Sequence, residues 1–488
     1  MRKRKLFLLL AIMHPQDRDG FGTLLASTWF NNSPQLLRFW KRWRRYLEEL
    51  PEVDPSPAEF LADTDIMPRR MNRLCSELKR KAEEFLALQE QESKVSRAGL
   101  PLLRALSARN APPDLLLRYV QEIHQQLQEE PVSSRRYFEE LELHIFEAEI
   151  AIGTRRTRDI WNRSFADLHH RLDLFYRLQK LKFIAASVNG QHIYYQQSPP
   201  VANGLSADMV AEIEAGEASP ICLAYYHSIG MHTENNRMTR DVHFTDLMDL
   251  LDQHAAGFER VEAMDLFGYA SNFCIRRANE GQREYLAHAA TLYRQMLNTG
   301  LALVKGRIPT QRFKNMVTLH CRLGMLDWAE RFIADYSPYI AGPNPALHLE
   351  YNTAVLAFHQ ADYARARDLL KKNITRNKDD VFYGIDARTY LWKAYFEDRH
   401  ALDLQEVDEM FRLYDSFRIF IDRNQKISRT HRDGYRNFIR EFKRFAEILQ
   451  LHPVPENRLR ALRDSVSEQE FMVNKPWFLE KIDQELRG

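Results

Sequence analysis

The sequence predicts an all-α fold, built as a right-handed superhelix (an α-solenoid) of antiparallel helix pairs. Three observations predict it: apolar residues recur at the period of a helix, strand-like alternation is nearly absent, and glycine is scarce at 18 of 488 residues. Hydrophobic residues make up 44% and charged residues 28%, a composition typical of a folded chain. The length allows about two to four domains, or one extended repeat array.

The chain begins with a basic stretch and a short apolar run. The basic residues at 2–5 precede apolar residues from Leu6 to Met13. This order is similar to that of a signal peptide, but the following residues, 14–17, supply no small-residue cleavage pattern. We therefore expect the start of a first helix here, with a signal segment as the alternative. No later run approaches the ~20 apolar residues that a membrane span needs.

Helix breakers divide the chain into three regions. Residues 1–187 are predicted to form an N-terminal helical region, residues 188–220 an irregular linker or long loop, and residues 221–488 a C-terminal helical-repeat region. Near the start, Asn31-Asn32-Ser33-Pro34 closes one helix and caps the next. Ser33 or Asn32 suits the cap because its side chain can accept a hydrogen bond from a free N–H of the first turn, where Pro34 also fits.

Amphipathic stripes support helices in both halves. Apolar residues follow i, i+3, i+4, i+7 spacing within 137–152, 168–184, 411–421 and 435–449. Such a stripe faces a core, and the charged residues between its members face water. These segments therefore predict long helices that pack on neighbours along one side.

A repeat is visible in the second half, with its clearest units at 310–343 and 347–380. The segment 324–329 (GMLDWA) lines up with 361–366 (ADYARA) at an offset of 37 residues. Each unit has the pattern helix, short turn, helix. This pattern resembles the tetratricopeptide repeat (TPR), a pair of antiparallel helices of ~34 residues. The C-terminal half is therefore expected to be TPR-like.

Repeats of this kind place their first helices along a concave face. A single unit cannot bury its apolar face alone, so function would follow from an extended surface. Lys314, Asn315 and Asn352 match part of the pattern that clamps a peptide carboxylate in some members of that family, although Thr318 replaces an expected asparagine. Charge-assisted donors on a rigid helix suit such a ligand. The candidate peptide-binding residues are Lys314, Asn315, Thr318, Arg322, Tyr351, Asn352 and His359.

Three motifs carry a resemblance that extends over nearly the whole chain. They lie at 21–31 (FGTLLASTWFN), at 416–421 (SFRIFI) with 435–439 (YRNFI), and at 474–482 (NKPWFLEKI). In order and spacing they are similar to an uncharacterised bacterial family of all-helical proteins with degenerate TPR-like repeats. The resemblance implies an intracellular, all-helical protein and no catalytic activity.

Composition and motif searches predict no enzyme. Four cysteines are too few for a disulfide framework and fit a reducing compartment, so we expect a cytoplasmic location. Nucleophile elbows and phosphate loops are absent from the sequence. Cys222, His227 and His232 are spaced by five residues and do not share a helix face, and His320 and Cys321 are adjacent. We therefore predict no catalytic residue, no cofactor and no metal site.

Two functional hypotheses remain. The first is a non-enzymatic scaffold or adaptor that binds a protein or peptide segment on the helical-repeat surface. The alternative is nucleic-acid or polyanion binding through basic helical faces at 38–45, 69–81 and 411–445, where aromatic residues beside arginine could stack on bases. The net charge of +2 gives no global attraction to nucleic acid, and the aromatics follow the core period. The candidate polyanion-binding residues are Lys41, Arg42, Arg44, Arg45, Arg436, Arg440, Lys443 and Arg444.

Overall fold

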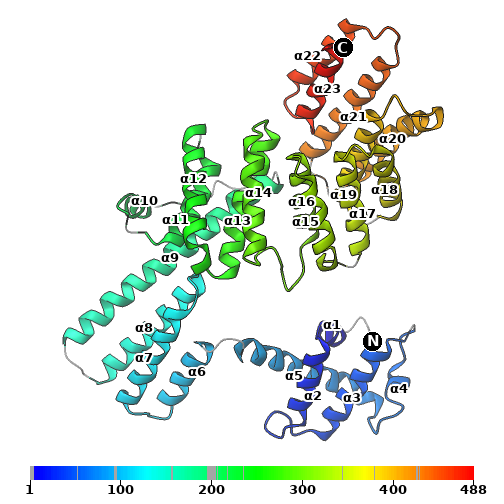
Figure 1. The fold of residues 1–488 in the computed structure, drawn as a ribbon. Helices are drawn as coiled ribbons and strands as arrows, with labels where there is room; N and C mark the ends of the chain where they lie inside the picture. The colour runs from blue at the N-terminus through cyan, green and yellow to red at the C-terminus, as the bar shows by residue number, and fades with distance from the viewer. Residues whose placement is uncertain are drawn as a thin grey trace. The chain divides into compact units, whose positions relative to one another are not determined.

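The computed structural model is helical throughout the part of the chain that it describes (Figure 1). That part comprises residues 5–51, 53–92, 96–154, 158–194, 205, 207–216, 218–234, 236–342, 344–377, 380–424, 427 and 429–487. These residues form 23 α-helices and no β-strand, so the all-α prediction is confirmed for them.

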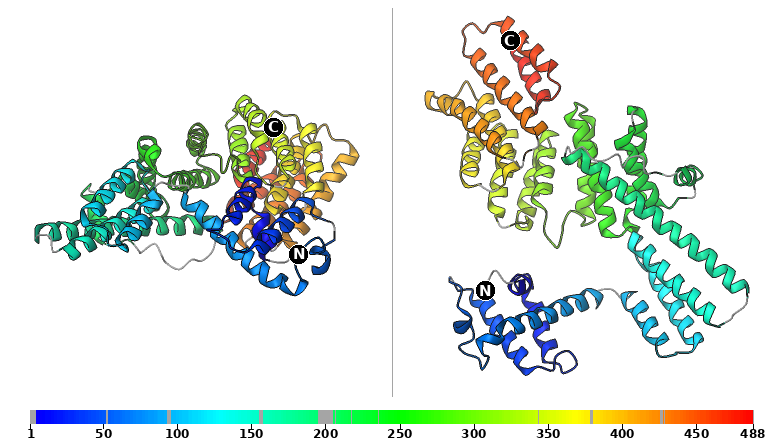
Figure 2. Two further views of the ribbon diagram at one scale, coloured as in Figure 1. Left: turned by 90° about the horizontal axis from the view of Figure 1, so that it is seen from below. Right: turned by 180° about the vertical axis from the view of Figure 1, so that it is seen from behind.

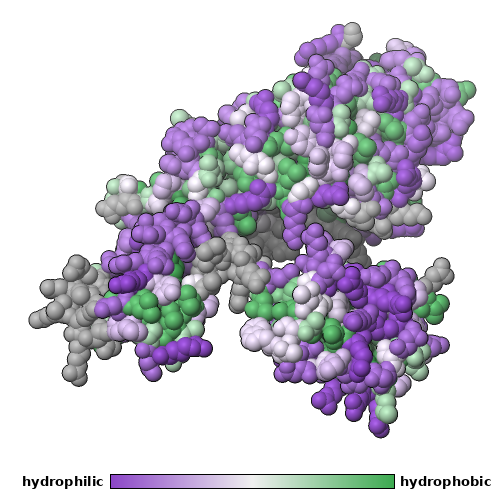
Figure 3. Space-filling model, turned by 60° about the horizontal axis from the view of Figure 1, so that its bottom comes forward, coloured by the Kyte–Doolittle hydropathy of each residue, from purple (hydrophilic) through white to green (hydrophobic). Residues whose placement is uncertain are grey.

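Among the described helices, none combines the length and the apolar composition that crossing a bilayer requires. The face shown in Figure 3 is mostly hydrophilic, with hydrophobic residues in separate patches. Hydrophobic burial therefore takes place mainly between helices.

The chain forms two compact units, which we describe separately. Unit 1 comprises residues 1–130 and 139–168, and unit 2 comprises residues 131–138 and 169–488. The chain passes between the units three times: after residue 130, which follows α7, within α8 (Ser134–Thr154) after residue 138, and within α9 (Arg158–Tyr194) after residue 168.

The predicted linker at 188–220 lies within unit 2 and is partly helical, in contrast to the expected loop. The helix α9 continues through Asn189 and Gly190, and α10 (Ala207–Glu214) lies further along. The reason is tertiary: Val188 and Asn189 are buried, and Asn272 Nδ2 donates a hydrogen bond to Asn189 Oδ1 at 3.2 Å. The predicted residues 195–204, 206 and 217 lie outside the described part of the chain.

Unit 1 has an aromatic core built on α3. Trp40, Trp43 and Tyr46 of α3 are buried, and the Trp43 ring lies 5.0 Å from that of Phe60. The predicted cap is confirmed, because Ser33 Oγ accepts a hydrogen bond from the Leu36 N–H at 3.3 Å. The helices that lie wholly in unit 1 are α1 (Lys5–Ala11), α2 (Pro15–Ala26), α3 (Pro34–Glu49), α4 (Pro57–Phe60), α5 (Met71–Glu92), α6 (Ser96–Ser107) and α7 (Pro113–Glu129).

Unit 2 is a succession of helices in which neighbours in sequence are neighbours in space (Figures 1 and 2). Each helix from α11 to α23 packs on the next, and α15, α17 and α19 also contact one another in turn. This order of contacts is typical of a repeat array. The helices are α11 (Pro220–Thr233), α12 (Arg237–His254), α13 (Arg260–Asn279), α14 (Glu284–Asn298), α15 (Thr310–Arg322), α16 (Leu326–Tyr336), α17 (Pro345–His359), α18 (Tyr363–Arg376), α19 (Val381–Glu397), α20 (Leu404–Arg423), α21 (Arg429–Leu449), α22 (Glu456–Glu468) and α23 (Lys475–Arg487).

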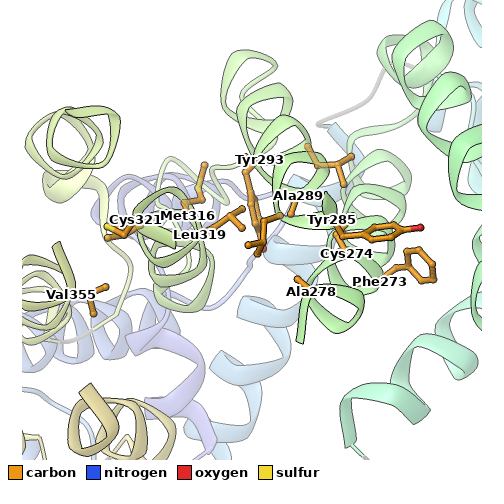
Figure 4. Packing of buried hydrophobic residues seen from close by; sticks show 14 of the residues in the cluster. Phe273, Cys274, Ala278, Tyr285, Ala289, Tyr293, Met316, Leu319, Cys321 and Val355 are labelled. Atoms are coloured by element: carbon orange, nitrogen blue, oxygen red, sulfur yellow. The ribbon is translucent and has the colours of Figure 1, made fainter. Parts of the chain in front are cut away.

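Large side chains fill the space between these helices (Figure 4). Phe273 of α13 and Tyr285 of α14 are buried with ring centroids 5.6 Å apart, and Tyr293 continues the layer toward α15. Aromatic burial of this kind supplies much of the apolar area that a helical array removes from water.

The two aligned repeat segments share local geometry. Gly324 and Ala361, which align at the turn between helices, both have left-handed backbone torsions, with φ of 73° and 60°. Ala329 and Ala366, which align at the small position of the second helix, are both completely buried. A left-handed conformation suits glycine and strains alanine, so the second turn carries a local cost that the first does not.

A buried carboxylate ties four helices of unit 2 together. Glu262 of α13 is 1% exposed and accepts hydrogen bonds from the N–H and Oγ of Ser134 at 3.2 and 3.1 Å, from Lys182 Nζ at 2.8 Å, and from the Tyr225 hydroxyl. These donors come from α8, α9 and α11. Burial raises the pKa of Glu262, but the bonds from Lys182 and Tyr225 outweigh it, so the pKa lies below its ordinary value.

The paired turns give a first prediction. Ala361→Gly should raise the free energy of unfolding by about 0.5–1 kcal/mol, because it relieves the left-handed strain at φ 60°. Gly324→Ala should lower it by about 1 kcal/mol, since no neighbouring atom would obstruct the added Cβ and only the strain remains. Denaturant titration of both variants checks this, and a loss of stability in Ala361→Gly would contradict it.

The buried carboxylate gives a second prediction. Glu262→Gln should lower the free energy of unfolding at pH 7 by about 3 kcal/mol, because Lys182 loses its buried partner. The folded pKa is lowered, so the wild-type contribution is complete above pH 4.5 and is lost as the pH falls through that lowered pKa. The difference in the free energy of unfolding between Glu262→Gln and wild type should therefore become smaller below pH 4.5. The exposed Glu468→Gln is the control, and a difference that is constant with pH would refute the prediction.

Candidate functional site

Three of the predicted peptide-binding residues face the interior of unit 2. Lys314 of α15 is 8% exposed and forms an ion pair with Asp386 of α19. Tyr351 and Asn352 of α17 are buried, and Asn352 Nδ2 donates a hydrogen bond to the His348 carbonyl at 2.7 Å. Lys314 joins α15 to α19, the Tyr351 ring packs against Tyr383 of α19, and the Asn352 bond lies within α17. All three side chains are buried and are not presented to a ligand.

Of the four remaining predicted residues, Asn315 is hydrogen-bonded within the protein, whereas the other three have unpartnered polar atoms or face solvent. Asn315 Nδ2 donates to the Tyr293 hydroxyl at 3.3 Å. Thr318 Oγ1 and His359 Nε2 are buried and have no hydrogen-bond partner in the described structure. Arg322 is exposed and makes no hydrogen bond or ion pair with any described residue. Thr318, Arg322 and His359 therefore keep hydrogen-bonding capacity for a ligand.

Lys393 of α19 joins these groups, and the sequence analysis missed it. It is 8% exposed, its Nζ donates to Asn474 Oδ1 at 2.8 Å, and it lies 4.7 Å from the centre of the Trp477 ring. Burial and the charge of Arg322 lower the pKa of Lys393 to about 7. The Lys393 amino group thus forms no ion pair with a carboxylate of the described chain.

We call Arg322, His359 and Lys393 the basic cluster. Burial, together with the charges of Lys393 and Arg322, lowers the pKa of His359 to about 4. A positive charge on one of these groups therefore disfavours protonation of its neighbours. Burial also lowers the pKa of the Arg322 guanidinium although water reaches its side chain.

The acidic groups near the basic cluster are already engaged. Glu397 Oε1 lies 2.8 Å from Lys481 Nζ, and Asp386 is paired with Lys314. The Tyr390 ring lies 5.6 Å from Lys393 Nζ and borders the same site. Because the carboxylates are taken, the charged guanidinium of Arg322 has no carboxylate partner among the described residues, and the cluster retains hydrogen-bonding capacity that suits an anionic group.

The basic faces of the alternative hypothesis are largely neutralised. In α3, Arg44 pairs with Asp19 at 2.7 Å, and Arg45 pairs with Glu49 at 3.5 Å. Arg42 donates to the Phe60 carbonyl at 2.6 Å. The aromatics beside them are buried and cannot stack on bases, whereas Lys41 is exposed.

The other two faces show the same pattern of pairing. Arg436 lies 2.7 Å from Asp422, Arg440 lies 2.8 Å from Glu441, and Arg444 lies 3.7 Å from Glu441. Lys443 lies 3.8 Å from Glu447. In 69–81, the partners are again helix neighbours: Lys79–Glu83, Arg80–Glu84 and Lys81–Glu84. These segments present alternating charges to solvent and not a continuous positive surface.

No protein-family model matches the chain, and neither a curated protein nor a solved structure matches it. The resemblance to the bacterial TPR-like family therefore stays a prediction from the sequence. The basic cluster is identified by the contacts of His359 and Lys393 with the Tyr390 ring and by the effect of the Arg322 charge on the pKa of both.

The lowered pKa of Lys393 gives a third prediction. Between its folded pKa of about 7 and its ordinary value of 10.5, the unfolded chain binds a proton that the folded protein does not. The free energy of unfolding of the wild-type protein should therefore increase as the pH rises from 7 to 10. Lys393→Met has no buried amine to deprotonate, so its stability should not depend on pH in this way. At pH 7 it should be more stable than wild type by roughly 1–3 kcal/mol.

Urea unfolding of both proteins from pH 6 to pH 10 measures this difference. The stability advantage of Lys393→Met should shrink toward pH 10. The exposed Lys372→Met serves as the control and should follow the wild-type curve. Parallel curves for wild type and Lys393→Met would contradict the prediction.

Proposed function

We propose that the protein is a non-enzymatic scaffold that binds an acidic segment of a partner protein on the surface formed by α15, α17 and α19. The observation that carries the proposal is the basic cluster, in which Arg322, His359 and Lys393 hold donor groups without carboxylate partners in the described structure. Buried or enclosed polar groups without partners are costly, so a ligand that satisfies them gains affinity.

The architecture that we propose for unit 2 is a right-handed superhelix of antiparallel pairs. Its support is the successive packing of α11 to α23 and the convergence of side chains from first helices. Lys314 of α15 reaches Asp386 of α19, and the Tyr383 hydroxyl donates to the Thr310 carbonyl at 2.8 Å. Side chains of α15 and α19, which are four helices apart along the chain, meet in this way when the array curves toward that side.

Recognition would combine charge with hydrogen bonding. The Arg322 guanidinium can bind a carboxylate with two parallel hydrogen bonds, a geometry that a lysine cannot supply. An anion beside Lys393 would offset its desolvation and favour its protonated form. The Thr318 hydroxyl and His359 Nε2 add polar contacts, and Tyr390 offers an aromatic wall. Rigid helices hold these groups in place, which limits the entropy lost on binding.

Nucleic-acid binding receives less support. Most of the candidate cations at 38–45, 69–81 and 411–445 have carboxylate partners or carbonyl acceptors within the chain. A phosphate backbone would have to displace those partners, and the neighbouring aromatics are buried. A single acidic group bound at the basic cluster also predicts a shallow dependence on salt, whereas many phosphate contacts predict a steep one.

A peptide-binding experiment tests the proposal and forms the fourth prediction. Labelled decapeptides from an Asp/Glu-rich library should bind the wild-type protein, and their Asn/Gln-substituted counterparts should not, as measured by fluorescence anisotropy. Arg322→Gln should weaken the acidic peptides by about 10–100-fold, because a charged hydrogen bond is lost. The exposed Arg365→Gln on α18 is the matched control and should bind normally.

Two outcomes would overturn the proposal. One is equal binding of acidic peptides to wild type and Arg322→Gln. The other is capture from native lysate that disappears with nuclease and persists in Arg322→Gln, which would favour the basic faces at 38–45 and 411–445.

A further inference from the structure

Two histidines and a glutamate meet in unit 1, on helices that take no part in the basic cluster. His124 lies on α7, and His144 and Glu147 lie one turn apart on α8. The helices pack through a shared buried cluster that includes Ile123 and Leu143. This packing brings the three side chains together from positions that are 20 residues apart in sequence.

The three side chains are arranged around one point. Glu147 Oε1 lies 3.3 Å from His124 Nε2, and Glu147 Oε2 lies 2.9 Å from His144 Nδ1. One ligand atom from each residue can be chosen so that all lie within 4.8 Å of one another. Ligand atoms around a tetrahedral zinc ion, each 2.0–2.1 Å from the metal, lie about 3.3 Å apart. A small closure of this group would therefore enclose an ion.

We propose that His124, His144 and Glu147 bind one divalent transition-metal ion, of which Zn²⁺ is the best fit. Two imidazoles and one carboxylate form a nitrogen- and oxygen-donor set that such ions prefer, whereas Mg²⁺ and Ca²⁺ prefer oxygen donors alone. The ion would take the place of the protons that the two rings now share with the carboxylate. Three protein ligands leave a fourth position for water.

The site is partly enclosed by protein. The side chain of His144 is 11% exposed, so an ion on its Nδ1 would be partly shielded from water. The side chains of His124 and Glu147 are about a quarter exposed (24% and 25%), so an ion and its water can enter from solvent.

The proposed ion would join α7 to α8 and stabilise unit 1 by binding only the folded form. It is independent of the proposed function, because the basic cluster lies in unit 2. Of the three ligands, the sequence shows only the pair at 144 and 147, at i, i+3 on one predicted helix. His124 becomes a partner only when the packing of α7 on α8 is known.

Metal titration of the full-length protein tests the inference and forms the fifth prediction. The protein is freed of metal by chelation, titrated with Co²⁺ and followed by its visible d–d absorption, and then titrated with Zn²⁺ in competition. Wild type should bind one ion with a tetrahedral Co²⁺ spectrum, and Zn²⁺ should raise its melting temperature. His124→Gln, His144→Gln and Glu147→Gln should each weaken Zn²⁺ binding by at least about 100-fold.

Controls distinguish lost ligands from lost folding. His170→Gln, at an exposed histidine, should bind Zn²⁺ as wild type does. Glu147→Gln keeps its size and its capacity for hydrogen bonds, and circular dichroism should show a wild-type helix content. Absence of Co²⁺ or Zn²⁺ binding to wild type would overturn the inference, and so would binding that survives in all three ligand variants.

Discussion

Buried charges of unit 2 find partners on other helices, and this constraint sets how the array is assembled. Glu262 of α13 is held by donors from α8, α9 and α11, and Lys314 of α15 is held by Asp386 of α19. Arg367 of α18 reaches Glu406 of α20 at 3.0 Å. Apolar side chains would tolerate many slightly different packings, but a buried charge without its partner costs several kcal/mol. Each pair therefore selects one register between helices.

The basic cluster departs from this rule. Arg322 and Lys393 come from α15 and α19, the same helices that Lys314 and Asp386 join, yet the described chain offers them no carboxylate. The structure thus satisfies one end of the α15–α19 surface internally, and the function proposed above assigns the other end to an external acidic group. Function is expected at sites where polar groups have no hydrogen-bond or ion-pair partner within the protein, because a ligand can supply that partner.

The sequence predicted local features well. It predicted poorly which side chains are buried between helices and which face solvent. Helical periodicity predicted the all-α class. Of the two predicted cap residues, Ser33 and Asn32, Ser33 is the cap, and this was predictable because capping depends on adjacent residues alone. The burial of Tyr351 and the engagement of Lys314 depend on which helices surround α15 and α17, and periodicity does not contain this information. The helical continuation of α9 through Asn189 also required a partner, Asn272, 83 residues away.

The chain passes between the two units three times, and this path imposes an order on their synthesis. Residues 131–138 leave the ribosome before the rest of unit 2, and the carboxylate that receives Ser134 is made 128 residues later. At roughly 5–20 residues per second, that segment waits for roughly 6–26 s. During this interval residues 139–168 complete unit 1. Unit 1 can therefore fold while residues 131–138 still lack the rest of unit 2 to pack on. A newly made chain then passes through a stage in which unit 1 is folded and unit 2 is not.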